Sequence, residues 1–152
     1  MTEIERALAC FNEGFSCAQA VLSTYAPRFG LDREMALRIA GAFGGGMGRL
    51  GEVCGAVTGA FMLIGLKYGK IRAEDDQARE TAYALVREFA DRFTSRNGSI
   101  RCKELLGYDI STPEGLALAR EREVFTTVCP KLVRDAAEII GQMLATADAG
   151  GG

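Results

Sequence analysis

The sequence lacks histidine entirely: none occurs among its 152 residues. This absence excludes a Ser-His-Asp triad, a Cys-His nucleophile pair and a metal site with histidine ligands. Long apolar runs are also missing, because the most hydrophobic stretch, 53–66, is interrupted by three glycines. A bilayer-spanning helix needs about 20 apolar residues, so this stretch predicts a buried core helix instead. Any chemistry here therefore depends on cysteine, carboxylate, lysine or backbone groups.

Charge of one sign is not in excess either. Lysine and arginine number 18 against 20 aspartates and glutamates, the net charge is −2, and no basic run occurs. This balance excludes the basic surface of nucleic-acid-binding proteins, so we expect no nucleic-acid partner. With 48% hydrophobic residues the chain is not disordered, and its length corresponds to one domain of ordinary size.

The N-terminal segment, residues 1–14, is acidic and amphipathic, without the basic start and apolar core of a signal peptide. We therefore expect a cytoplasmic protein with no membrane partner. In the reducing cytoplasm, its five cysteines are expected to be free, metal-bound or redox-cycling rather than joined in structural disulfides.

Apolar residues recur at helical spacing along the chain, and no alternating strand pattern is present. The pattern predicts an all-α, single-domain helical bundle of about six to eight helices. We expect this domain to cover residues 1–147, with a flexible glycine-rich tail at 148–152. The expected helices cover residues 4–13, 17–26, 33–43, 52–68, 73–96, 99–106, 113–128 and 130–145.

Local signals set several of these boundaries. Ser16, Asp32, Ser99 and Thr112 are candidate caps, and Pro113 suits the first position of a helix. Two core faces are also expected from helical spacing. They consist of Met35, Leu37 and Ile39 in the third helix, and Tyr83, Val86, Phe89 and Phe93 in the longest.

Four of the five cysteines fall at expected helix starts: Cys17, Cys54, Cys102 and Cys129. Unpaired N–H groups and the positive end of the helix dipole stabilise a thiolate there and lower the pKa of the thiol. The thiolate is the reactive species both in disulfide exchange and in metal binding. We expect the four to converge in space, with Cys54 as the thiol of lowest pKa, because the surrounding glycines expose backbone N–H groups.

The alternative for each of these cysteines is a small buried hydrophobic residue, which is common for cysteine in helices. Cys10 differs from the other four, because it lies in the middle of a helix next to Phe11. For Cys10 we predict a packing role.

Glycines cluster before and around Cys54. Gly46, Gly48 and Gly51 have the G-x-G-x-x-G spacing, but the preceding segment is helical rather than a strand, so a nucleotide site is not expected. Gly51, Gly55 and Gly59 recur every four residues and form a flat face. This face would allow other helix starts that carry cysteines to approach Cys54 closely.

The segment around Cys54 resembles a family of redox-active proteins named for its C_GCAxxG_C_C cysteine pattern. Residues 54–59 read Cys-Gly-Ala-Val-Thr-Gly and match the family's Cys-Gly-Ala-x-x-Gly core in full. Cys17 matches the upstream cysteine, and Cys102 and Cys129 match the two downstream ones. The resemblance covers nearly the whole chain and implies a redox role for these four cysteines, whereas Cys10 lies outside the pattern.

Two mechanisms fit the four cysteines Cys17, Cys54, Cys102 and Cys129. In the first they are catalytic, and a pair, with Cys54 central and Cys17 its expected partner, cycles between dithiol and disulfide or transfers electrons. The protein would then be a thiol–disulfide oxidoreductase. In the second all four bind zinc or an iron–sulfur cluster, although no C-x-x-C pair is present. A helical binding module with packed cysteines, and no enzyme activity, is the third reading.

Nearby cations could tune a thiolate, and Arg49, Arg101 and Lys103 are the candidates, with solvated surface charge as the alternative. A redox partner protein or a small thiol or metal substrate is expected. The sequence leaves open whether the chain forms a homo-oligomer and which other residues bind a cofactor.

Overall fold

Side chains close to the helix starts fix where the helices begin. Ser16 forms a reciprocal capping box: its hydroxyl accepts a hydrogen bond from the Gln19 N–H, and the Gln19 side chain accepts one from the Ser16 N–H. Asp32 and Asp75 cap later helices through a carboxylate that accepts a backbone N–H three residues on. Thr112 caps a helix that opens with proline, as expected from the sequence.

The computed structural model describes the backbone of residues 1–150 and the side chains of residues 1–145. Within that part of the chain there are eight α-helices of five residues or more and no strand, which confirms the all-α, single-domain prediction. The elements are α1 Glu3–Asn12, α2 Cys17–Tyr25, the 3₁₀ turn η1 Ala26–Phe29, α3 Arg33–Ala40, α4 Gly44–Met47, α5 Gly55–Tyr68, α6 Asp76–Asn97, α7 Cys102–Leu106, α8 Pro113–Glu121, α9 Val124–Thr127 and α10 Cys129–Gly150.

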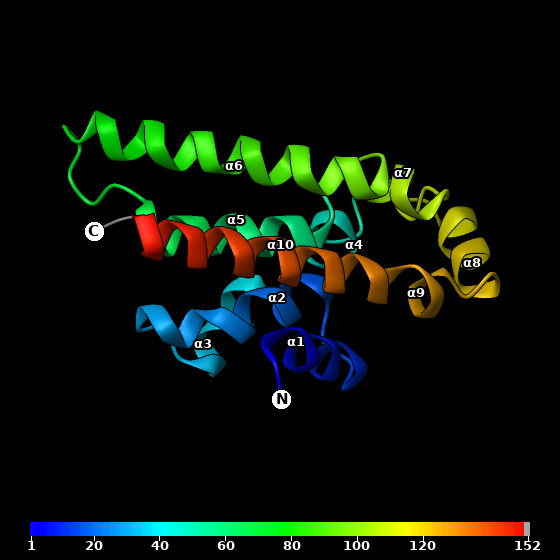
Figure 1. Ribbon diagram of the computed structural model, residues 1–152. Coiled ribbons are helices and arrows are strands. Elements are labelled where there is room, and N and C mark those ends of the chain that lie inside the picture. The colour runs from blue at the N-terminus through cyan, green and yellow to red at the C-terminus, as the bar shows by residue number, and fades with distance from the viewer. Residues whose placement is uncertain (151–152) are drawn as a thin grey trace.

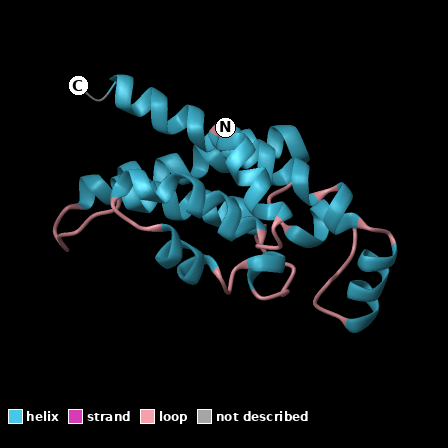
Figure 2. Ribbon diagram, turned by 90° about the horizontal axis from the view of Figure 1, so that it is seen from below, coloured by secondary structure: helices cyan, strands magenta, loops and turns pink. Residues whose placement is uncertain are grey.

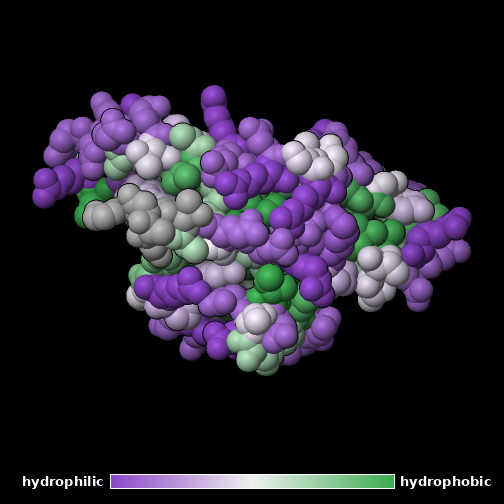
Figure 3. Space-filling view, viewed as in Figure 1, coloured by the Kyte–Doolittle hydropathy of each residue, from purple (hydrophilic) through white to green (hydrophobic). Residues whose placement is uncertain are grey.

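Helices α5 and α10 lie side by side in the centre, with α6 along one side and α1 to α3 on the other (Figure 1). Both begin at the same end of the molecule, where α4, α7 and α9 also lie. Helices and loops account for the whole described chain in the second view (Figure 2). The face in Figure 3 is mostly hydrophilic. None of the described helices combines the length and apolar character needed to cross a bilayer.

The core lies between α2, α5, α6 and α10, each of which contributes large side chains that are fully buried. These are Val21, Leu22, Val57, Leu63, Ile64, Phe89, Phe93, Val133, Ile139, Ile140 and Leu144. Helix α5 is apolar on nearly all sides and is surrounded by neighbours, as expected for the interrupted hydrophobic stretch.

The expected core face of α3 is wrong in two positions. Met35 and Ile39 are 49% and 48% exposed, and Ala36 and Ala40 are fully buried instead. Small alanines allow α3 to pack closely on α2, so the side of α3 with the smaller residues is buried. On α6, Phe89 and Phe93 are buried and Val86 packs against the core as expected, whereas Tyr83 is 60% exposed and Ala82 and Leu85 contact the core instead.

Some helix boundaries also differ from the expected ones. Ser99 does not cap α7; its hydroxyl accepts a hydrogen bond from the Arg101 N–H, and Arg101 occupies the cap position. The expected helix over 113–128 is broken at Glu123, whose φ of 56° lies in the left-handed region. The backbone of α10 continues past the expected end to Gly150. A flexible tail at 148–152 stays a prediction, and residues 151 and 152 lie outside the described residues.

Candidate functional site

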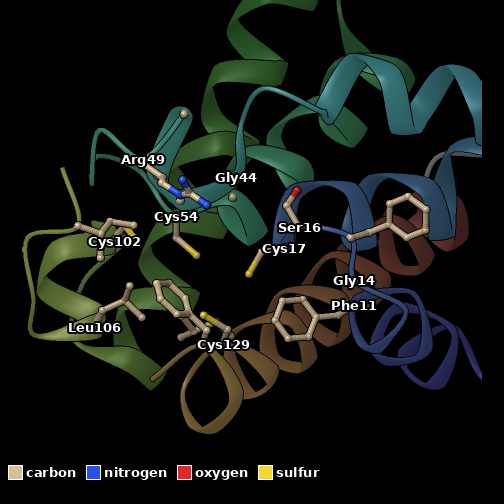
Figure 4. A pocket seen from close by; sticks show the side chains of 18 of the residues that line it. Phe11, Gly14, Ser16, Cys17, Gly44, Arg49, Cys54, Cys102, Leu106 and Cys129 are labelled. Carbon is tan, nitrogen blue, oxygen red and sulfur yellow. The ribbon is translucent and has the colours of Figure 1, made fainter. Parts of the chain in front are cut away.

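Four cysteines from four different elements line one cavity of about 790 Å³. They are Cys17, Cys54, Cys102 and Cys129, and Figure 4 shows their side chains around a common space. The cavity lies at the end of the molecule where α2, α5, α7 and α10 begin. Cys10 is not among its lining residues; it is buried beside Ser23, with the Cys10 Sγ 3.6 Å from the Ser23 Oγ.

Each of the four cysteines sits at the start of a helix. Cys17, Cys102 and Cys129 are the first residues of α2, α7 and α10, and Cys54 is the cap residue of α5. All are free thiols; Cys17 is half-buried and the other three are buried. Helix starts present N–H groups without intrahelical acceptors, so this placement provides hydrogen-bond donors for thiolates.

The glycines of the Cys-Gly-Ala-x-x-Gly segment bring Cys54 next to Cys17. A Cβ at Gly55 would lie 2.9 Å from the Ala18 backbone nitrogen, and one at Gly59 would lie 2.9 Å from the Ala18 carbonyl oxygen. Both distances are too short for any residue with a side chain. The two glycines therefore allow α5 to pack directly on the backbone of α2, immediately after Cys17.

A short backbone pairing brings Cys102 to the same place. Val53 and Arg101 form an antiparallel bridge, in which the Cys54 N–H donates to the Ile100 carbonyl at 2.8 Å. The Cys102 N–H donates to the Glu52 carbonyl in return, at 2.6 Å. Gly46 allows this approach, since a Cβ there would lie 2.7 Å from the Cys102 Cβ. The bridge holds the starts of α5 and α7 together although they are far apart in sequence.

The surroundings of Cys54 lower the pKa of its thiol. The hydrogen bond that the Cys17 thiol donates to Cys54 lowers the pKa of Cys54, and burial opposes this shift. The N–H groups of Ala56 and Val57, at the start of α5, add to the lowering. The expected low pKa of Cys54 is confirmed in direction, with Cys17 as the main cause and the helix start as the second.

The pKa values of Cys17 and Cys102 shift the opposite way. Hydrogen bonds with Cys129 and with Cys54, together with burial, raise the pKa of Cys17. Burial raises the pKa of the Cys102 thiol to about 12, and negative charge on Cys54 and Cys129 adds to this. The site therefore favours a thiolate on Cys54 over one on Cys17 or Cys102.

This arrangement predicts an order of alkylation in the folded protein. At about pH 9, iodoacetamide is expected to modify Cys54 first, because the thiolate is the reactive form. Cys102 is expected to react much more slowly than Cys54, since its pKa of about 12 leaves it protonated and it is buried. Pulsed alkylation followed by peptide mapping measures the order. Equal rates for Cys54 and Cys102 in the folded protein, and not only after denaturation, would contradict the prediction.

Of the three cations considered for tuning a thiolate, Arg49 lines the cavity, whereas Arg101 and Lys103 do not. Arg101 pairs with Glu52 at 3.2 Å and with Glu104 at 3.6 Å, and Lys103 lies 3.8 Å from the Glu52 carboxylate. Neither lines the cavity, and both are paired surface charges, which agrees with the surface-charge alternative for these two residues. Arg49 does line the cavity. Arg120 lines it too, and sequence reasoning missed it because α8 gives no local sign of where it packs.

Arg49 belongs to an unusual backbone turn. Five successive residues, 45–49, have φ between 61° and 67°, so α4 is a left-handed turn. Glycine adopts this conformation readily, but it costs roughly 1–2 kcal/mol for a residue with a side chain, such as Met47 or Arg49. Besides Arg49, four glycines in this turn and just before it line the cavity that holds the four thiols: Gly44, Gly45, Gly46 and Gly48.

A metal centre is not preassembled from these side chains. Within the residues that the structure describes, no group of three or more Cys, Asp or Glu side chains could hold a metal ion. The residues as placed do not fit a zinc ion or an iron–sulfur cluster, so no step is derived through either.

Residues 15–143 match the model of a protein family described as "Putative redox-active protein (C_GCAxxG_C_C)". The match covers most of the chain, including the four cysteines that line the cavity. The chain belongs to this family of redox-active proteins. No curated protein and no solved structure was found to match it.

Proposed function

We propose that the protein is a thiol–disulfide oxidoreductase in which Cys54 is the attacking thiol and Cys17 the resolving thiol. The observation that carries this proposal is geometric: Cys17 and Cys54 stand at the starts of α2 and α5, which pack directly on each other at Gly55, and both line one cavity. One group of the pair is favoured as a thiolate and the other keeps its proton, which is the division of roles that disulfide exchange needs.

The reaction begins when the Cys54 thiolate attacks a substrate disulfide. A bond forms between the Cys54 sulfur and one half of the substrate, and the other half leaves as a thiolate that takes up a proton. Cys54 is then uncharged, so Cys17 loses the hydrogen bond to a thiolate and the negative charge that raised its pKa.

Cys17 can then lose its proton and attack the Cys54 sulfur. This second exchange forms the Cys17–Cys54 disulfide and releases the other half of the substrate as a thiol. The substrate gains two electrons from the protein and two protons, one released by Cys17 and one from solvent. A dithiol reductant, by the reverse exchanges, returns the protein to its starting state.

Trapping the disulfide tests this proposal. The reduced protein is mixed with the neutral disulfide dithiodipyridine, quenched with acid, alkylated and mapped by mass spectrometry. We expect a Cys17–Cys54 disulfide as the first product, none in C54S, and a mixed disulfide that accumulates on Cys54 in C17S. C10S serves as the matched control, because Cys10 lies outside the cavity, and should behave as wild type. A first disulfide that omits Cys54 would refute the proposed roles.

A further inference from the structure

The cavity that holds the four thiols is lined by two arginines and by no carboxylate among the described residues. Arg49 and Arg120 are both exposed at its edge, and neither has an ion-pair partner in the described part of the chain. The whole protein carries a net charge of −2. The thiol cavity is therefore a locally positive region on a slightly negative molecule, which favours anionic ligands.

The backbone places Arg49 at considerable cost. Its φ of 65° is a conformation that residues with side chains rarely adopt. Gly45 provides the room for its side chain, because a Cβ at Gly45 would lie 2.8 Å from the Arg49 Cγ. Strain of this kind is retained mainly at functional sites. Figure 4 shows the guanidinium group of Arg49 at the cavity, in the region of Gly44 and Cys54.

Within the residues that the structure describes, Arg49 has no ion-pair partner and does not contribute to the lowered pKa of Cys54. The hydrogen bond from Cys17 and the backbone N–H groups of α5 account for the lowered pKa of Cys54, and no arginine contributes. With no carboxylate paired to it and no thiolate that depends on it, this guanidinium is free to bind a ligand.

The rest of the lining is mainly apolar. It includes the side chains of Phe11, Phe15, Leu106, Ile110, Leu116 and Phe125. A cavity of about 790 Å³ falls within the range of small-molecule sites, roughly 300–1,000 Å³. Arginine binds carboxylates through two parallel N–H···O bonds, with a geometry that lysine cannot reproduce.

We propose that the substrate is a small organic disulfide that carries carboxylate groups, bound by Arg49 and Arg120 with its sulfur atoms beside Cys54. This inference rests on the proposed thiol–disulfide function and specifies its substrate class. The apolar lining contacts the body of the ligand, and the two guanidinium groups hold its carboxylates. Cys54 then attacks the nearer sulfur and releases the other half as a carboxylate-bearing thiol, which takes up a proton.

The experiment compares two aromatic disulfides, the dianionic dithiobis(nitrobenzoate) and the neutral dithiodipyridine. Stopped-flow absorbance measures the rate of the Cys54-dependent phase for wild type, R49Q, R120Q and the double variant. We expect each single variant to slow the anionic probe several-fold, and the double variant to slow it by roughly tenfold or more, with the neutral probe unchanged. Added salt should slow the reaction of wild type with the anionic probe and leave its reaction with the neutral probe unchanged, because salt screens the charge of the two arginines. R49K keeps the positive charge without the paired N–H donors, so its rate with the anionic probe should lie between those of R49Q and wild type.

The matched control is R87Q, which removes an exposed charge on α6, away from the cavity, and should change neither rate. Equal slowing of both probes in R49Q and R120Q would overturn the inference, because the arginines would then act on the thiol and not on the ligand. Unchanged rates with both probes would overturn it as well, while leaving the redox function in place. No Cys54-dependent phase with either probe in wild type would refute the proposed function itself.

Discussion

Gly59→Ala is expected to destabilise the protein and to slow the reaction of Cys54, although Gly59 lies a full helical turn from that cysteine. The new Cβ would lie 2.9 Å from the Ala18 carbonyl oxygen and 3.3 Å from the Val21 Cβ, so α5 must move away from α2. Overpacking of this kind costs about 1–3 kcal/mol, which exceeds the gain of about 0.5–1 kcal/mol from replacing a helical glycine. Thermal or urea unfolding measures the loss of stability.

The same displacement moves the start of α5 relative to Cys17. We expect weaker hydrogen bonding between the two thiols and slower alkylation of Cys54 at neutral pH. Gly65→Ala is the matched control on the same helix, because a Cβ there meets nothing within 4 Å. It should stabilise the protein by about 0.5–1 kcal/mol and leave Cys54 unchanged. If G59A were as stable and as reactive as G65A, the close helix contact would not be needed to form the site.

Cys17→Ala is expected to move the alkylation profile of Cys54 to higher pH. The Cys17 thiol donates the hydrogen bond that contributes most to the lowered pKa of Cys54, so its removal raises that pKa towards the ordinary value. At a pH below the new pKa less thiolate is present, and alkylation of Cys54 slows in proportion to the lost thiolate. At a pH above it, Cys54 should react at least as fast as in wild type, because a thiolate of higher pKa is the better nucleophile.

Two further variants separate this effect from a general loss of structure. Cys17→Ser keeps an O–H donor beside Cys54, so its profile should remain closer to wild type than that of C17A. Cys129→Ala removes a thiol that contacts Cys17 but does not contribute to the pKa of Cys54, and should leave the Cys54 profile in place. Iodoacetamide rates measured against pH decide the outcome. Superimposable Cys54 profiles for wild type and C17A would show that Cys17 does not set the pKa of its neighbour.

The chain-local features of the site could be predicted from sequence. A cap such as Ser16 acts within three residues, so the start of α2, and with it the position of Cys17, follows from neighbouring residues. The four-residue spacing of Gly55 and Gly59 also marked a face suited to close packing. The third glycine of that series, Gly51, lies outside α5, where a Cβ would meet the Lys103 side chain.

Features that depend on long-range placement were missed or assigned wrongly. Arg101 and Lys103 are next to Cys102 in sequence, yet their charges are directed to Glu52, 49 and 51 residues away. In sequence, Arg120 lies far from every cysteine except Cys129. Its place at the cavity depends on how α8 packs in the folded protein. On α3, the choice between the Met35 and Ala36 faces depends on how closely α2 approaches, which no local pattern specifies.

By itself, the sequence determined that this protein is all-α and which four thiols begin helices. These follow from composition, helical periodicity and caps, all of which act over a few residues. Only the tertiary structure decided that the four thiols line one cavity, that Cys102 is buried there, and that Arg49 and Arg120 border that cavity. Hydrogen bonds, burial and charge act through space over a few ångströms, and those distances are set by how closely the helices pack.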